Sequence, residues 1–187
     1  MPNDLEKNPW KTIKSELIYE CPWFSLTKHD VLNPAGKPGT YSVVNYKNLA
    51  IGIVPLDENY NTWIVGQFRY PLNRYSWEIP EGGGKLSVPP LESAKRELLE
   101  EAGITAKRWT KIQEMDLSNS VTDEVVILYL AQDLNFEKPQ PEDTEQLQVK
   151  KLPFDELYKM VLNGEVTDSL SVTAVLKIKL LINEGKL

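Results

Sequence analysis

The chain has 187 residues, of which 41% are hydrophobic and 26% are charged, and its formal net charge is −6. This composition is typical of a globular protein, and its acidic balance argues against duplex nucleic acid as a partner, because phosphate binding needs clustered lysine and arginine. The sequence contains no run of about 18 consecutive apolar residues, so we expect no membrane-spanning helix.

Two residue types occur once each: Cys21 is the only cysteine and His29 the only histidine. A single cysteine excludes an internal disulfide and a multi-cysteine metal site, and it suits a reducing compartment, for which the cytoplasm is the default. The N-terminus lacks the apolar segment of a signal peptide, so none is expected. His29 lies in an alternating segment, where we expect it on the surface of a strand.

The first half of the chain is predicted to form strands. Apolar runs on either side of the polar turn Asp57–Asn61 predict a hairpin, and Gly82–Gly84 predict a loop after a short extended piece. The expected strands cover residues 13–19, 24–31, 39–46, 49–56, 62–68 and 77–80.

The first helix is predicted to start at Pro89–Pro90 and to end at Gly103. Its apolar stripe consists of Leu91, Ala94, Leu98 and Ala102, which recur at helical spacing. Further strands are expected over residues 109–117, 124–133 and 146–152, a polar loop over 138–145, and helices over 154–162 and 169–182. Together these elements predict an α+β fold in which helices cover a sheet.

Three acidic residues share one side of the first helix. Glu97, Glu100 and Glu101 stand at i, i+3 and i+4, where like charges repel by roughly 0.2–0.5 kcal/mol per pair. A bound cation would offset this repulsion, and carboxylates without histidine or cysteine favour Mg²⁺ or Mn²⁺ over zinc. The three glutamates alone fit a solvated acidic face at least as well, whereas the nearby glycines, which let the backbone approach a ligand, favour a metal site.

Gly82 through Ile104 resembles the Nudix box, G-x5-E-x7-R-E-U-x-E-E-x-G-U, in which U is a bulky aliphatic residue. Every fixed position matches except Val88, which stands where the family has its first glutamate. In the family this glutamate mainly holds the motif arginine, so we expect Arg96 to pair with Glu100 or with a loop acid instead. The resemblance implies a Nudix α/β/α sandwich, a mixed central sheet with helices on both faces, plus an N-terminal antiparallel β arm.

From about residue 20 onwards the chain is similar to the ADP-ribose and nucleoside-diphosphate-sugar pyrophosphatase branch of this family. The segments that carry the similarity include Gln67–Pro71, Trp77–Gly82 and Ser118–Glu124. The similarity implies two domains, a dimerisation and base-binding arm over residues 1–47 and a Nudix hydrolase domain over 48–187. It also implies a homodimer with exchanged N-terminal strands.

The same resemblance implies an enzyme that uses Mg²⁺ or Mn²⁺ to split nucleoside diphosphate sugars into a nucleoside monophosphate and a sugar phosphate. It implies catalytic roles for Glu124 (general base or water orientation), Glu100 and Arg96, and metal binding by Glu97, Glu100, Glu101 and the main-chain carbonyl of Glu81. Substrate binding is expected from Arg69 (phosphates), from Trp23, Tyr41 and Tyr46 (base), and from Glu78, which could equally be a partner of Arg96.

Two alternatives stay open. Val88 motivates a non-catalytic sensor of nucleotide sugars, and a Nudix enzyme could also act on another nucleotide pyrophosphate, although Gln67–Arg69 and the N-terminal arm speak against this. Each candidate residue also has a plain structural interpretation, since strand aromatics are more often core residues and Arg69 could be a surface arginine at a strand end.

Overall fold

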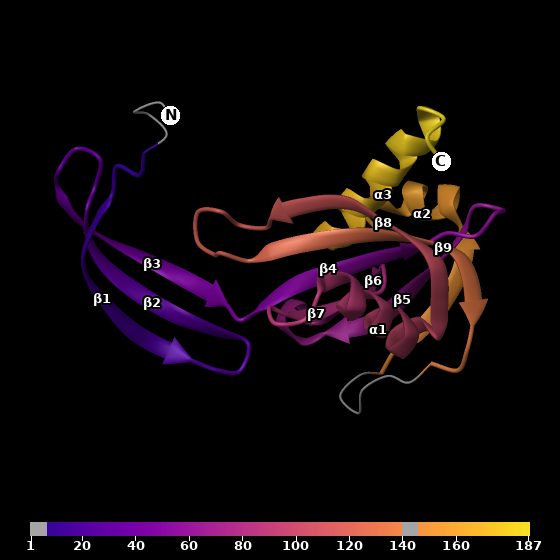
Figure 1. Cartoon of the computed structure of the whole chain (residues 1–187), viewed down its shortest axis with the longest axis horizontal. Helices are drawn as coiled ribbons and strands as arrows, with labels where there is room; N and C mark the ends of the chain where they lie inside the picture. The colour runs from indigo at the N-terminus through magenta and orange to yellow at the C-terminus, as the bar shows by residue number, and fades with distance from the viewer. Residues whose placement is uncertain (1–6, 140–145) are drawn as a thin grey trace. The chain divides into compact units, whose positions relative to one another are not determined.

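The computed structural model describes residues 7–139 and 146–187 (Figure 1). Contacts divide this part of the chain into two compact units. The first contains the chain up to Lys47 together with Ser118–Glu124, and the second contains the remainder. No helix among the described residues is long and apolar enough to cross a membrane.

The N-terminal unit is an antiparallel sheet with the order β1-β2-β3. The turn between β2 and β3 is closed by Asn33, whose side-chain oxygen accepts the N–H groups of Ala35 and Lys37. Segment 118–124 adds to β3, because the Val44 N–H donates to the Val121 carbonyl over 2.9 Å. The three predicted strands are confirmed, with the bounds β1 Lys11–Glu20, β2 Phe24–Leu32 and β3 Pro38–Tyr46.

The second unit holds two sheets, one with the order β7-β4-β9-β8 and one with the order β10-β5-β6. The first sheet is mixed, because β4 runs parallel to β9 and antiparallel to β7. The bounds are β4 Asn48–Pro55, β5 Asn61–Arg69, β6 Arg74–Glu78, β7 Glu81–Lys85, β8 Ile104–Asp116, β9 Val125–Phe136 and β10 Gln148–Pro153.

Two sequence predictions about this region are wrong. The predicted hairpin does not form: β4 and β5 join different sheets, and a single bridge between Leu56 and Thr62 connects them. Both strands are apolar on both faces, so each can be buried between distant partners rather than against its neighbour in sequence. The predicted glycine loop is strand β7, in which Gly83 pairs with Ala50 of β4.

Three α-helices of the described residues cover the sheets: α1 Pro90–Ala102, α2 Phe154–Leu162 and α3 Ser169–Asn183. Alternate side chains of β4 face opposite ways, so that Ile51 and Ile53 pack with Leu98 of α1, while Val54 packs in a second core with Leu157 of α2 and residues of α3. Helices therefore lie on both faces of the sheet, which confirms the predicted sandwich (Figure 1).

The predicted start, stripe and end of α1 are also confirmed. Ala94 and Leu98 are fully buried, and Gly103 ends the helix with φ +65°, its N–H donating to the carbonyls of Leu98 and Leu99. A side chain at Gly103 would also press against Pro139, whose nearest atoms lie 2.8 Å from the position a Cβ would take. Packing of the stripe turns the neighbouring Glu97 and Glu101 inward, where the second unit has its candidate site.

Candidate active site

Two glutamates of α1 are buried although their side chains are ionisable. Glu97 is 7% exposed and Glu101 2%. Glu101 Oε2 accepts the main-chain N–H of Glu81 over 2.8 Å, which ties the helix to the start of β7. Because a buried carboxylate is costly unless it is paired or bound to a metal, this placement needs specific partners.

Arg96 supplies one set of partners. Its Nη1 lies 2.6 Å from Glu100 Oε2, and its Nη2 lies 2.5 Å from Glu97 Oε1 and 2.9 Å from the Gly83 carbonyl oxygen. The predicted pairing with Glu100 is therefore confirmed. Glu97, Glu100 and the Gly83 carbonyl together hold the motif arginine in a chain that has Val88 in place of the usual glutamate.

Strand β7 approaches α1 closely at Gly82. A Cβ built there would overlap the carboxylate of Glu97. Gly83 points to the other side of the strand, where the nearest atom to a Cβ is Asn48 Nδ2 at 3.8 Å, an ordinary contact. Gly82 thus sets the position of the Glu97 carboxylate.

A second ion-pair cluster surrounds Arg69 at the end of β5. Its Nε lies 3.0 Å from both carboxylate oxygens of Glu78, and its Nη2 lies 2.6 Å from Glu78 Oε2 and 3.0 Å from Glu81 Oε1. Glu78, which is 3% exposed, therefore pairs with Arg69, while Arg96 pairs with the α1 glutamates. Charge-assisted, bidentate pairs of this kind hold a guanidinium in one orientation.

Glu81 joins the two clusters. Its main-chain N–H binds Glu101, its Oε1 binds Arg69, its Oε2 is fully buried, and its carboxyl group makes a hydrogen bond with the Asp168 side chain. Burial raises the pKa of Glu81 well above the usual value of a carboxyl group; the nearby Asp168 and Glu78 carboxylates raise it further, and Arg69 opposes them. Sequence reasoning considered only the main chain of Glu81 and missed its side chain.

The glutamates of α1 and β7 offer carboxylate oxygens, which are the ligands that a hard divalent cation prefers. Within the described part of the chain, no group of three or more His, Cys, Asp or Glu side chains is arranged to hold a metal ion, since Arg96 pairs with Glu97 and Glu100 while Glu101 accepts the Glu81 N–H. The donors are nevertheless carboxylate oxygens on a rigid helix, two of them belonging to buried residues. The metal-binding roles of Glu81, Glu97, Glu100 and Glu101 stay predictions.

The remaining sequence candidates belong to the N-terminal unit. Burial, and then the charge of Asp123, raises the pKa of Glu124. Asp123 Oδ1 accepts the Tyr46 N–H over 2.7 Å, and burial followed by the charge of Glu124 raises the pKa of the Tyr46 hydroxyl. The unit therefore brings Glu124 and Tyr46 together, whereas Trp23 is 66% exposed.

Tyr41 forms a small aromatic site with a residue that sequence reasoning missed. Its ring meets Trp10 edge to face with 5.4 Å between centroids, and its hydroxyl donates to the Ser120 carbonyl over 2.7 Å. Both rings line a pocket of about 220 Å³ together with His29. Trp10 precedes the first predicted strand. Its position as an aromatic residue in a polar N-terminal segment was the sequence feature that could have identified it as a site residue.

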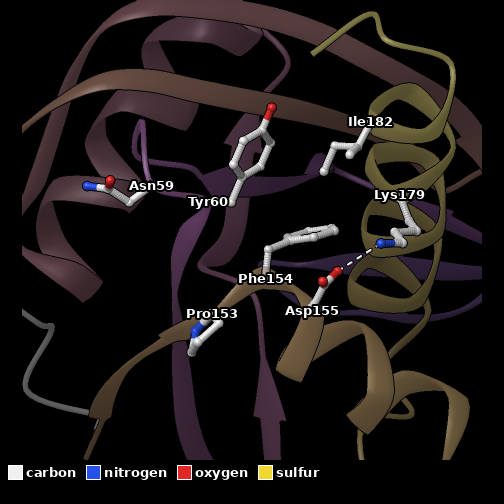
Figure 2. A pocket seen from close by; sticks show the side chains of 7 residues that line it. All are labelled: Asn59, Tyr60, Pro153, Phe154, Asp155, Lys179 and Ile182. Atoms are coloured by element: carbon white, nitrogen blue, oxygen red, sulfur yellow. Dashed lines mark hydrogen bonds and ion pairs between the residues drawn. The ribbon is translucent and has the colours of Figure 1, made fainter.

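Another pocket of the second unit contains none of the predicted site residues. It has about 300 Å³ and lies between the β4–β5 turn, the start of α2 and α3 (Figure 2). Its charged residues are Asp155 and Lys179, whose side chains pair over 2.8 Å. None of the described residues that line this pocket is among the catalytic candidates, and the candidates of the second unit lie on β5, β6, β7 and α1.

We predict that Gly82→Ala destabilises the protein by about 1–3 kcal/mol, because the added methyl group forces the Glu97 carboxylate away. Gly83→Ala is the matched control, since its methyl group meets only ordinary contacts. Chemical unfolding of both variants measures the difference. Equal unfolding free energies for the two variants would contradict the close approach of β7 to α1.

Comparison with known proteins agrees with this geometry. Residues 46–171 match the NUDIX domain family, and residues 10–44 match the family described as nucleoside diphosphate sugar hydrolase N-terminal domain. A solved structure described as an ADP compounds hydrolase superposes with a TM-score of 0.84, at 19% identity, over 95% of this chain and 97% of that one. This last likeness supports the fold alone.

Curated relatives extend over most of the chain. A protein of Mycobacterium tuberculosis (strain ATCC 25618 / H37Rv) described as ADP-ribose pyrophosphatase is 33% identical over 180 residues, which cover 93% of this chain and 85% of the relative. A protein of Bacillus subtilis (strain 168) with the same description is 33% identical over 167 residues, covering 88% of this chain and 90% of the relative. The chain is therefore a Nudix pyrophosphohydrolase of the ADP-ribose and ADP-sugar pyrophosphatase branch.

Proposed function

We propose that this enzyme hydrolyses the pyrophosphate bond of nucleoside diphosphate sugars, of the ADP-ribose, ADP-glucose or GDP-mannose type, to a nucleoside monophosphate and a sugar phosphate. The observation that carries the proposal is the pair of buried carboxylates, Glu97 and Glu101, beside strand β7. Glu97 lies close to Gly82, and Glu101 accepts the main-chain N–H of Glu81. The matching N-terminal family and the descriptions of the relatives support this substrate class.

In this proposal Glu97, Glu101 and the Glu81 main-chain carbonyl hold Mg²⁺ or Mn²⁺, with Glu100 as a further ligand or neighbour. The bound ion supplies positive charge to the pyrophosphate oxygens and lowers the pKa of water. Arg96 keeps Glu97 and Glu100 in position through its two ion pairs. Its firm placement also weakens the case for a non-catalytic sensor, which rested on Val88.

Glu124 is the proposed general base or water-orienting group. A base must be deprotonated to accept the proton of the attacking water, and it works best when its pKa lies near the working pH. Burial and Asp123 move the pKa of Glu124 upward, in the direction that such a role requires. The raised pKa also means that the active, deprotonated form is lost at a higher pH than for an exposed glutamate.

Arg69 is the proposed phosphate ligand. Glu78 and Glu81 engage its Nε and Nη2, and its Nη1 makes no hydrogen bond within the described residues. A guanidinium that is fixed along one edge presents the remaining nitrogen in a defined direction. We therefore propose that Nη1 donates to a substrate phosphate oxygen and that Glu78 positions the arginine.

The N-terminal arm, up to Lys47, is the proposed dimerisation and base-binding region, with Trp23, Tyr41 and Tyr46 as base ligands. All residues of β1 are exposed, and β1 is an edge strand of its sheet, so its free edge and apolar side chains suit a second copy of the chain. Exposed apolar residues here include Ile13 (58%), Leu17 (58%) and Ile18 (51%). The single cysteine fits the cytoplasm as the proposed compartment.

Product analysis tests the reaction. With Mg²⁺, ADP-ribose, ADP-glucose or GDP-mannose is expected to give a nucleoside monophosphate and a sugar phosphate, while a nucleoside triphosphate is turned over much more slowly. Preferred turnover of the triphosphate would favour the other Nudix activity, and binding without turnover of any substrate would favour the sensor.

In the same assay Glu101→Gln is expected to lose nearly all activity, because it removes a metal-binding charge. Glu92→Gln is the control, since Glu92 is an exposed acid in the first turn of the same helix. Full activity in Glu101→Gln would refute the metal site.

Glu124→Gln is expected to lower kcat by roughly 10²–10⁴-fold, the usual contribution of general base catalysis. The wild-type pH profile is expected to fall on its acidic side above the ordinary glutamate pKa of about 4.3, and the variant to lack this fall. Glu114→Gln, an exposed acid of β8, serves as control. A loss smaller than about tenfold would remove Glu124 from this role.

Leu17→Asp is expected to shift the protein from dimer to monomer in sedimentation velocity, because it places a charge on the proposed seam. Leu162→Asp is the matched control, since Leu162 is 61% exposed but lies at the end of α2. A monomeric wild type, or an unchanged dimer in Leu17→Asp, would rule out this seam.

A further inference from the structure

The segment Ser118–Glu124, which ends in the proposed base Glu124, belongs to the N-terminal unit although it is distant from that unit in sequence. It lies along the edge of β3 that faces away from β2. The Val44 N–H donates to the Val121 carbonyl over 2.9 Å, and the Val44 carbonyl accepts the Asp123 N–H over 3.3 Å. The segment therefore extends the sheet by a short parallel pairing with β3.

Asp123 continues this pairing with its side chain. Its Oδ1 accepts the Tyr46 N–H over 2.7 Å, and its Oδ2 accepts the side-chain amide of Asn45 over 2.9 Å. Two hydrogen bonds from consecutive residues of β3 hold the carboxylate in one orientation. Because Asp123 directly precedes Glu124, this attachment fixes the backbone from which the Glu124 side chain extends.

Tyr41 makes a second attachment, nearer the start of the segment. Its hydroxyl donates to the Ser120 carbonyl over 2.7 Å. The N–H groups of Val121 and Thr122 both donate to the Ser118 carbonyl over 2.9 Å, so the backbone here forms a closed turn. Tyr41 thus holds this turn against β3, while Asp123 holds the end of the segment. A base ligand would use the face of the Tyr41 ring, so the hydroxyl is free for this second task.

Asp123 and Glu124 differ in exposure, although they are neighbours in sequence. Asp123 is exposed, whereas Glu124 is partly buried. Burial raises the pKa of Glu124 most, and the charge of Asp123 raises it further. The Tyr46 hydroxyl, whose pKa is raised by burial and then by Glu124, is a further titratable neighbour. Asp123 therefore acts on Glu124 in two separable ways, through its hydrogen bonds to β3 and through its charge.

We propose that Asp123 and Tyr41 are positioning residues for the base: by attaching segment 118–124 to β3, they fix the direction in which Glu124 presents its carboxylate to water. The proposal rests on the proposed function, in which Glu124 deprotonates or orients the attacking water. A carboxylate that loses its orientation lowers kcat without weakening substrate binding. The N-terminal arm thus takes part in the chemical step as well as in dimerisation and base binding.

Steady-state kinetics with ADP-ribose and Mg²⁺ test both attachments. Asp123→Ala removes two hydrogen bonds and is expected to lower kcat roughly 5- to 50-fold with little change in KM. Tyr41→Phe removes one hydrogen bond but keeps the ring, and is expected to lower kcat roughly 2- to 10-fold, again with little change in KM. Glu58→Ala and Tyr60→Phe, at exposed positions of the β4–β5 turn, are the matched controls and are expected to keep wild-type kinetics.

Asp123→Asn separates the hydrogen bonds from the charge. The new amide oxygen still accepts the Tyr46 N–H, and Asn45 can turn its own amide to accept from the new amide group, so kcat at the optimum is expected to stay near the wild-type value. Loss of the neighbouring negative charge lowers the pKa of Glu124, so the deprotonated base persists at lower pH and the acidic limb of the pH profile moves to lower pH. Glu58→Gln is expected to leave this limb in place. A loss of kcat as large as that in Asp123→Ala would overturn the attachment through hydrogen bonds.

A double variant decides whether Asp123 acts through the base. A positioning residue has no further effect once the group that it positions is disabled, so Asp123→Ala is expected to cost nothing more in the Glu124→Gln background. The same loss of kcat in both backgrounds would indicate a merely structural role and would overturn the proposal. Wild-type kcat in both Asp123→Ala and Tyr41→Phe would also overturn it, while the hydrolase activity of the wild type would stand.

If the wild type cleaves no nucleoside diphosphate sugar, the proposed function fails, and hydrogen–deuterium exchange of the full chain then decides the attachment. The amides of Tyr46 and Asp123 are hydrogen-bonded where the segment meets β3. They are expected to exchange faster in Asp123→Ala than in the wild type or in Glu58→Ala, because the local structure opens more often. Faster exchange supports the attachment, and unchanged exchange overturns it.

Discussion

The close approach of strand β7 to helix α1 is the constraint on which the rest of the site depends. Gly82 has no side chain, so the Glu97 carboxylate occupies the space that a Cβ would need, and the Glu81 N–H reaches Glu101 in the next turn of the helix. These two contacts place buried carboxylates beside a strand that leads directly to Arg69 through the Glu81 side chain. An alanine in place of Gly82 would displace the Glu97 carboxylate, which pairs with Arg96.

The two-sided strand β4 makes this approach stable. Its alternate residues fill two separate cores, one under α1 and one under α2 and α3, so the strand that pairs with β7 is itself held on both faces. Each fully buried aliphatic side chain contributes roughly 1.5–3 kcal/mol relative to exposure. Such packing contributes favourable free energy, whereas the burial of Glu97 and Glu101 costs free energy.

Arg96 illustrates how one substitution in a motif can be absorbed by neighbouring groups. Val88 cannot bind a guanidinium, yet Arg96 is held by Glu97, Glu100 and the Gly83 carbonyl. The strand and the helix together thus perform the task of the missing glutamate. Glu78 is buried beside Arg69 and holds this second arginine of the site through an ion pair.

The sequence by itself determined the secondary structure of most of the chain, the start and end of α1, and the family, because periodicity, capping residues and the long Nudix motif are local signals. It also identified the charged residues of both clusters. Local signals could not determine which strands pair: β4 and β5 separate into two sheets, and the glycine segment is a strand, because their partners are distant in sequence. Nor could they assign Glu78 to Arg69, reveal the buried oxygen of Glu81 or place segment 118–124 beside β3, since these relations exist only once the chain has folded.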